Sequence, residues 1–388
     1  MSTIKKFEKP LGMRDTFPET YEKIETARQI GRNFLRSRGF DFIETPTLEY
    51  YDTVGKASAI FDARLFKLVD SQGNTLVLRP DMTSPIARVA TSKLLKEKIP
   101  LRLAYSANVF RAQQKEGGRP AEFGQMGIEI IGDKSVFADA EVIITAINLI
   151  QEFGIESFTI TIGHAGVLEG ILKDYTENTD QYETLRKLLV ERNYVGFEEA
   201  VKSFDLPQVK SDALLQFINK ATHLTTIKDI EQYVRKNDAL EDMIQLSKLI
   251  EQAGLSEYIS FDFTLSSHMN YYTGMLFEVY AAGSGFVLGN GGRYDGLLQL
   301  FDSDVGATGF SLRTDRLLEV LPNKEEQEDS TVCIIFEGHE FSKALELATT
   351  FRNNGERVTL QSKDGLLNEE AFTKLFGRVV YVNQEEGQ

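Results

Sequence analysis

Apolar residues recur in the first third of the chain with spacings that predict a helix followed by paired strands. Residues 19–39 predict an amphipathic helix that ends at Gly39. The apolar side chains that recur there at helical spacing are Tyr21, Ile24, Ala27, Phe34 and Leu35. Residues 42–46 predict a short extended segment that stops at a proline, and residues 66–79 predict a hairpin that turns near Gly73.

Residues 101–132 predict two long antiparallel strands joined by a loop at 115–121. The second strand alternates between an apolar set, Met126, Ile128 and Ile130, and a second set, Gln125, Gly127 and Glu129. Such alternation is typical of a sheet with one face in water. The other interpretation is that the second set forms the floor of a pocket, and the pattern alone leaves both open.

Between the hairpin and the first long strand, residues 81–84 predict a connector. Ser84 would be the N-cap and Pro85 the first residue of the helix that follows. After a strand predicted at 155–163, residues 167–256 are mostly helical in pattern, which indicates a helical insertion.

The C-terminal third returns to strands, expected at 258–265, 274–279 and 286–288. The glycine-rich run 289–296 predicts a tight turn that opens a helix, because glycine alone adopts many turn conformations without strain. Residues 306–316 predict a strand followed by a helix, and 331–384 predict a β-α-β-α-β unit.

These elements predict an α+β protein with two domains. We expect a core domain at 1–322 that contains the helical insertion, a charged linker at 323–330, and a small α/β domain at 331–388.

Composition narrows the functional classes. The 388 residues include 43 Lys+Arg and 58 Asp+Glu, a net charge of −15, which argues against a broad grip on a phosphate backbone. The one cysteine, Cys333, allows no internal disulfide and fits a cytoplasmic protein. No apolar run reaches the roughly 18–20 residues that span a bilayer, so no membrane association is expected.

Two kinds of site are excluded by motif. The chain has no Walker-type phosphate loop, and no G-x-G-x-x-G run follows a strand. Its four histidines are scattered without metal-ligand spacing. We therefore expect no metal and no cofactor.

Six short segments, taken in order, carry more information than any one of them. They are LRPDMT at 78–83, VFRAQ at 109–113, GRPAEFGQ at 118–125, NYYTG at 270–274, GGRYDG at 291–296 and GFSLRTDR at 309–316. This set resembles the core of histidyl-tRNA synthetase, a class II aminoacyl-tRNA synthetase, over residues 12–318. The resemblance implies a class II antiparallel sheet with flanking helices, and residues 39–46 resemble the motif that builds the dimer interface in that family.

The resemblance also implies a pocket for histidine. The positions that match the family's amino-acid site are Asp81, Thr83, Arg111, Gln125, Glu129 and Tyr272, with Tyr271 alongside. Carboxylate, carbonyl and hydroxyl oxygens suit the ligand ammonium, and Glu129 suits an imidazole N–H. Asp81 stands where the family usually has Glu, so its reach is shorter by one methylene.

The positions that serve ATP and catalysis in the family are altered. Gln113 stands in place of an adenine-contacting Glu, Ala121 in place of a second loop arginine, and Ser267 in place of the catalytic arginine. Only Arg119 and Arg316 remain as a vestigial nucleotide site beside Arg111. Loss of one preorganised donor costs on the order of 10²–10³ in rate, so we expect no catalytic residues and no aminoacylation.

A histidine pocket, altered catalytic positions and a short C-terminal domain together resemble a paralogous family, the regulatory subunits of ATP phosphoribosyltransferase. That resemblance implies a non-catalytic subunit that partners the short-form catalytic subunit in the first step of histidine biosynthesis. It also implies L-histidine as effector, a homodimer, and no tRNA partner. Two alternatives stay open: a divergent active histidyl-tRNA synthetase, and a free-standing amino-acid- or tRNA-sensing module.

Overall fold

The computed structural model describes residues 6–113, 120–222, 224, 226–229, 237–265, 272–322 and 331–382. The chain divides into two compact units, Met1–Leu321 and Pro322–Gln388. The expected linker at 323–330 lies outside the described residues. No helix in the described ranges is long and apolar enough to cross a membrane.

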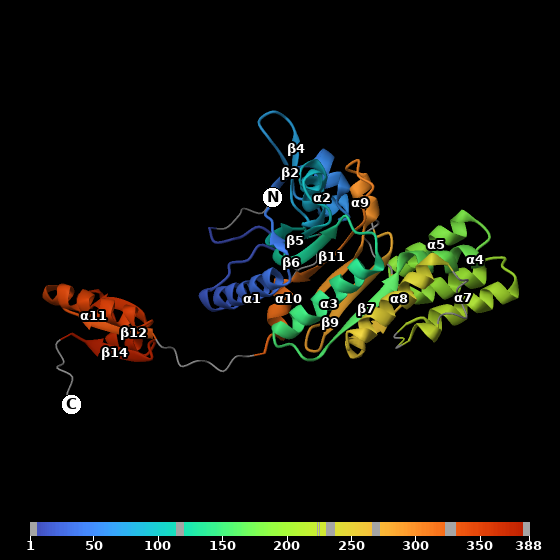
Figure 1. The fold of residues 1–388 in the computed structure, drawn as a ribbon. Helices are drawn as coiled ribbons and strands as arrows, with labels where there is room; N and C mark the ends of the chain where they lie inside the picture. Colours follow the sequence, from blue (N-terminus) through green and yellow to red (C-terminus); the bar gives the residue numbers. More distant parts are fainter. Residues whose placement is uncertain are drawn as a thin grey trace. The chain divides into compact units, whose positions relative to one another are not determined.

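The first unit is built on a sheet for which eight strands are described, in the order β1-β5-β6-β11-β10-β9-β7-β8 (Figure 1). Their bounds are β1 Asp41–Phe42, β5 Leu101–Phe110, β6 Glu122–Ile131, β7 Phe158–His164, β8 Ile259–Phe261, β9 Met275–Ala281, β10 Gly289–Arg293 and β11 Ala307–Arg313. The inner strands pair antiparallel, while β1 with β5 and β7 with β8 pair parallel at the two edges. The predicted long antiparallel pair is confirmed as β5 and β6.

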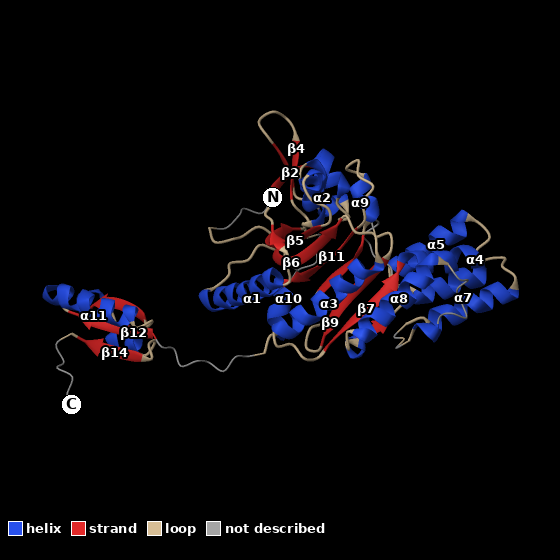
Figure 2. Cartoon of the chain, viewed as in Figure 1, coloured by secondary structure: helices blue, strands red, loops and turns tan. Residues whose placement is uncertain are grey.

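Two helical layers cover the sheet (Figure 2). On one face lie α1 Pro18–Ser37, α3 Val136–Glu152 and α10 Thr314–Val320, and on the other lie α2 Thr83–Ser92 and α9 Asp295–Gln299. The predicted first helix is confirmed, and Gly39 follows it with a φ of 79°, a conformation that glycine adopts without strain. Helix α1 approaches the sheet closely at Gly31, where a Cβ atom would collide with Met126.

The alternation along β6 separates two hydrophobic cores. Met126, Ile128 and Ile130 pack in the core on the α1 and α3 side. Gln125 and Glu129 point to the opposite side and are only 5% and 1% exposed, so this face of β6 is not in water. The interpretation as a pocket floor is therefore the correct one.

Three smaller groups of elements complete the fold. A second sheet has the order β2-β4-β3, with β2 Leu48–Tyr50, β3 Lys67–Val69 and β4 Thr75–Leu78, which confirms the predicted hairpin. The helices between β7 and β8 are α4 Ala165–Tyr175, α5 Thr179–Val190, α6 Tyr194–Ser203, α7 Gln208–Lys220 and α8 Asp238–Gln252.

The second unit has a parallel sheet in the order β13-β12-β14. Its bounds are β12 Thr331–Phe336, α11 Phe341–Asn353, β13 Arg357–Ser362, α12 Glu369–Thr373 and β14 Arg378–Tyr381.

Two local predictions are wrong. Helix α2 begins at Thr83, so Ser84 is not its N-cap and Pro85 is not its first residue; instead the Ser84 N–H donates to the Asp81 carboxylate at 2.9 Å. The run from Gly289 to Arg293 is strand β10 rather than a turn, and residues 286–288 precede that strand. Strand geometry does not require glycine, so the glycines of β10 need another explanation.

Candidate functional site

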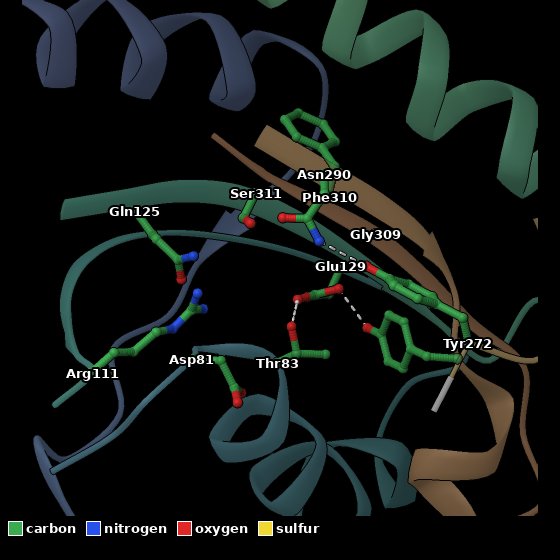
Figure 3. A pocket seen from close by; sticks show the side chains of 11 residues that line it. Asp81, Thr83, Arg111, Gln125, Glu129, Tyr272, Asn290, Gly309, Phe310 and Ser311 are labelled. Atoms are coloured by element: carbon green, nitrogen blue, oxygen red, sulfur yellow. Dashed lines mark hydrogen bonds between the residues drawn. The ribbon is translucent and has the colours of Figure 1, made fainter. Parts of the chain in front are cut away.

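One pocket opens on the α2 and α9 side of the central sheet, with about 340 Å³ of space outside the atoms, part of it in contact with solvent. The residues that line it are Asp81, Thr83, Arg111, Gln125, Glu129, Tyr272, Asn290, Tyr294, Gly309, Phe310 and Ser311 (Figure 3). Segments far apart in the sequence meet here because β6, β10 and β11 are neighbours in the sheet.

Glu129 forms the buried end of the pocket. The Tyr294 hydroxyl donates to its Oε2 at 2.5 Å and the Thr83 hydroxyl donates to its Oε1 at 2.9 Å. Burial raises the pKa of Glu129 to about 8, although both hydroxyl hydrogen bonds act in the opposite direction. The carboxyl group is thus fixed in orientation and poised to titrate near neutral pH.

Glycines make room for this carboxylate. Gly309 pairs with Glu129 across β11 and β6, and a Cβ atom at Gly309 would overlap Glu129 Oε2. A Cβ atom at Gly292 in β10 would collide with the Tyr272 ring, and one at Gly291 with the Phe277 ring. Gly309 and Gly292 therefore supply space for pocket side chains, whereas Gly291 makes room for Phe277 in the core on the other face. Among these three glycines only Gly292 has a positive φ.

Asp81 lies at the opposite wall, just before helix α2. Its Oδ2 accepts a hydrogen bond from the Ser58 hydroxyl at 2.5 Å, and its Oδ1 accepts from the Ser84 N–H at 2.9 Å. These two donors hold a side chain that is shorter than the usual Glu, and the carboxylate is only 5% exposed. A buried carboxylate held in this way can accept hydrogen bonds from an ammonium group.

Arg111 and Gln125 line the pocket on a third side, at the left in Figure 3. The Arg111 Nε donates to the Pro80 carbonyl at 2.9 Å, which anchors the guanidinium. Arg111 also lies 5.2 Å from the centroid of the Phe123 ring, and Arg313 lies 3.6 Å from the same centroid. Arg313 is in turn bound through two nitrogens to Asp315, at 2.6 and 3.1 Å.

Tyr272 and Asn290 form the wall beside Glu129. The Asn290 side-chain amide donates to the Tyr272 hydroxyl oxygen at 3.2 Å. Burial raises the pKa of Tyr272, so its phenol stays protonated over the physiological range. The wall therefore carries a neutral hydroxyl with a defined acceptor contact.

The structure brings six predicted site residues together and leaves others elsewhere. Asp81, Thr83, Arg111, Gln125, Glu129 and Tyr272 all line the pocket. Arg316 does not line it: its guanidinium donates to the Val287 carbonyl and lies 5.2 Å from the Phe286 ring centroid. Arg119, Tyr271 and Ser267 lie outside the described residues.

Three polar residues of the pocket were missed by sequence reasoning: Asn290, Tyr294 and Ser311. Asn290 and Tyr294 lie in the glycine-rich run that was predicted as a turn. A strand assignment for that run would have indicated that alternate side chains of β10 face the same side as Glu129.

The polar groups that line the pocket suit a small zwitterion with a polar ring. Two carboxyl groups and a hydroxyl can accept from an ammonium and a ring N–H, while a guanidinium and an amide can bind a carboxylate. Among the described residues, no cluster of three or more His, Cys, Asp or Glu side chains is arranged to hold a metal ion.

Two family models match the chain. The model described as "Histidyl-tRNA synthetase" matches residues 12–317, and the model described as "Histidyl-tRNA synthetase HisZ, C-terminal domain" matches residues 333–383. Together they span both compact units.

Curated relatives match over nearly their full length. A protein of Lysinibacillus sphaericus named "ATP phosphoribosyltransferase regulatory subunit" is 65% identical over 380 residues, which cover 98% of this chain and 99% of that one. A Bacillus subtilis protein of the same name is 46% identical over 378 residues, covering 97% and 96% of the two chains.

Solved structures agree on the fold. The crystal structure of an ATP phosphoribosyltransferase regulatory subunit/histidyl-tRNA synthetase from Bacillus halodurans matches with a TM-score of 0.90 and 43% identity, covering 98% of this chain and 99% of that one. A histidyl-tRNA synthetase from Nostoc sp. matches with a TM-score of 0.76 at 18% identity, covering 95% and 89% of the two chains. The predicted α+β class, with a class II synthetase-like sheet, flanking helices and a small C-terminal domain, is confirmed.

Proposed function

The chain belongs to the family of ATP phosphoribosyltransferase regulatory subunits, and we propose that it binds L-histidine and that this binding changes the activity of a short-form catalytic subunit. In this role it is required for the first step of L-histidine biosynthesis and makes that step sensitive to the end product. The observation that carries the proposal is the buried Glu129, held by two hydroxyl groups in the same pocket as Asp81, Arg111 and Gln125.

Each part of L-histidine has a matching group. We propose that Asp81 and Thr83 bind the α-ammonium together with the Gln125 carbonyl, that Arg111 binds the α-carboxylate, and that Glu129 and Tyr272 bind the imidazole. Thr83 contributes twice, because its hydroxyl hydrogen already goes to Glu129 and its oxygen lone pairs are left to accept from the ammonium. Tyr271, which the resemblance also assigns to this site, lies outside the described residues.

We propose further that the chain does not aminoacylate tRNA. Ala121 is fully buried, so the second loop arginine of the synthetases has no counterpart here and no space. Gln113 uses its amide nitrogen to donate to the Pro120 carbonyl at 2.9 Å. Arg313 covers one face of the Phe123 ring, at 3.6 Å from its centroid. The names of the relatives do not favour the alternative of an active synthetase.

We propose a homodimer as the first level of assembly, with the catalytic subunit added to it. Exposed apolar side chains near α1 and on the small sheet support this proposal. They are Phe17, Tyr21, Leu48, Tyr50 and Leu68, each more than 40% exposed. Burial of exposed apolar side chains at a protein–protein interface is favourable. The biosynthetic role and the single cysteine, Cys333, support a cytoplasmic location.

Calorimetry with L-histidine tests the pocket directly. Truncating one partner of a buried charged hydrogen bond costs about 2–5 kcal/mol, so Glu129→Ala should weaken binding by at least roughly 30-fold. Glu122→Ala, an exposed Glu on the same strand, is the matched control and should bind as the wild type does. Equal binding by Glu129→Ala and wild type, or leucine binding as tightly as histidine, would refute the assignment.

A further inference from the structure

We infer that Asn290 is a specificity-determining residue that acts through Tyr272: it fixes the Tyr272 hydroxyl as a hydrogen-bond donor to the acceptor nitrogen of a neutral imidazole. The inference rests on the proposed histidine site and extends it to a residue that the six synthetase-like segments do not assign. Asn290 lies on β10, lines the pocket and is part-buried.

The polarity of the contact decides the role of the hydroxyl. The Asn290 Nδ2 donates to the Tyr272 oxygen at 3.2 Å. A phenol has one hydrogen, and an amide N–H that donates to its oxygen cannot also receive that hydrogen. The Tyr272 hydrogen is therefore directed away from Asn290, and a bare ring nitrogen of a ligand placed against Glu129 can accept it in the complex.

Glu129 has the complementary polarity. Its two oxygens accept from Tyr294 and Thr83. A ring N–H that donates to this carboxyl group favours its ionised form, which has about four acceptor sites and can accept this further hydrogen bond. The pocket thus presents one acceptor and one donor to the ring. A neutral imidazole has one N–H and one bare nitrogen, whereas a pyrrole has only the N–H.

The backbone holds this arrangement in place. Gly292 lies two residues beyond Asn290, where a Cβ atom would collide with the Tyr272 ring, so the ring packs directly against β10. Asn290 pairs with Ser311 on β11 and with Glu278 on β9, which fixes its position in the interior of the sheet.

The test compares L-histidine with the two pyrrolylalanine isomers, in which one ring nitrogen at a time is replaced by C–H. The isomer that binds more tightly keeps the N–H that reaches Glu129. In the wild type, histidine should bind about tenfold more tightly than this isomer, the size expected for one neutral hydrogen bond. In Asn290→Ala and in the isosteric Asn290→Asp, which cannot donate, this ratio should fall to about twofold or less.

A double-mutant cycle separates this role from a structural one. In a Tyr272→Phe background, Asn290→Ala should change the ratio no further, because the hydroxyl through which it acts is gone. Asn219→Ala, an exposed Asn whose amide donates to a helix carbonyl, is the control and should keep the wild-type ratio.

Three results would overturn the inference. Asn290→Ala and Asn290→Asp could weaken histidine and pyrrolylalanine equally, which would mean a structural role. Asn290→Ala could lower the ratio as much in the Tyr272→Phe background, which would mean a direct contact with the ligand. Absence of histidine binding by the wild type would overturn the proposed function as well, whereas the first two results would leave it standing.

Discussion

Replacing Glu129 with Gln should make the stability of the first unit less sensitive to pH. Glutamine has nearly the same shape and stays neutral, so it removes the titration while keeping an oxygen that accepts from one of the two hydroxyls. The other hydroxyl, of Tyr294 or Thr83, must turn to accept from the new amide. That reorganisation adds an offset that does not depend on pH.

The magnitude follows from the pKa of Glu129, which burial raises from an ordinary value of 4.5 to about 8. The folded state then binds the proton more tightly than the unfolded state does. The contribution of Glu129 to the free energy of unfolding is therefore fully present below pH 4.5 and is lost as the pH rises toward 8. The slope is about 1.4 kcal/mol per pH unit, which amounts to about 4 to 5 kcal/mol over the whole window.

Guanidinium denaturation, followed by circular dichroism between pH 5 and pH 9, measures this effect. The free energy of unfolding of Glu129→Gln minus that of the wild type should increase with pH up to about pH 8 and level off above it. Glu122→Gln, at the exposed end of the same strand, is the matched control for the chemical change alone. A flat or decreasing difference for Glu129→Gln would refute the claim that this carboxyl group is buried and neutral in the free protein.

Three further outcomes are expected. The purified chain should show no histidine-dependent pyrophosphate exchange, and Ser267→Arg alone should not restore it; exchange at a rate typical of a synthetase would contradict the non-catalytic role. Light scattering at micromolar concentration should give at least a dimer of the 43.7 kDa chain, and a monomer mass would argue against the proposed interface. Gly309→Ala should displace the Glu129 carboxylate and weaken histidine binding at least about tenfold, whereas Gly285→Ala, with nothing within 4 Å, should not; equal affinities would mean that Gly309 is not needed for space.

Much of the central sheet could be predicted because its signals are local. Alternation along 122–131 gave the two faces of β6, Gly39 marked the end of the first helix, and Gly73 marked the turn of the hairpin. The same alternation could not say whether Gln125 and Glu129 face water, because the cover over them comes from α2 and α9, which are distant in sequence.

The two errors have different causes, the first a local contact and the second long-range packing. Ser84 and Pro85 carry the usual signals of a helix start, but the Asp81 carboxylate accepts the Ser84 N–H and the helix begins one residue earlier than Ser84. The run from Gly289 is rich in turn formers, yet it is a strand. Its glycines are set by what lies across the sheet, namely Phe277 and Tyr272, which no local pattern reveals.

Site residues that belong to a recognised motif could be predicted from the sequence. Contacts that depend on how the strands pack together could not. Tyr294 lies within a matched segment, but its hydrogen bond to Glu129 depends on the neighbouring positions of β6 and β10 around β11. Asn290 precedes that segment and is placed by sheet register alone.

Inhibition of the reconstituted enzyme by histidine is the most direct test of the proposed regulatory pocket. The short-form catalytic subunit is combined with the wild-type chain or with Glu129→Ala, and phosphoribosyl transfer is measured over a range of histidine concentrations. Histidine can regulate only if it binds one state of the complex more tightly than the other. Both complexes should be fully active without histidine, and the half-inhibiting concentration should be at least roughly 30-fold higher for Glu129→Ala. Superimposable inhibition curves would contradict the proposed regulatory pocket.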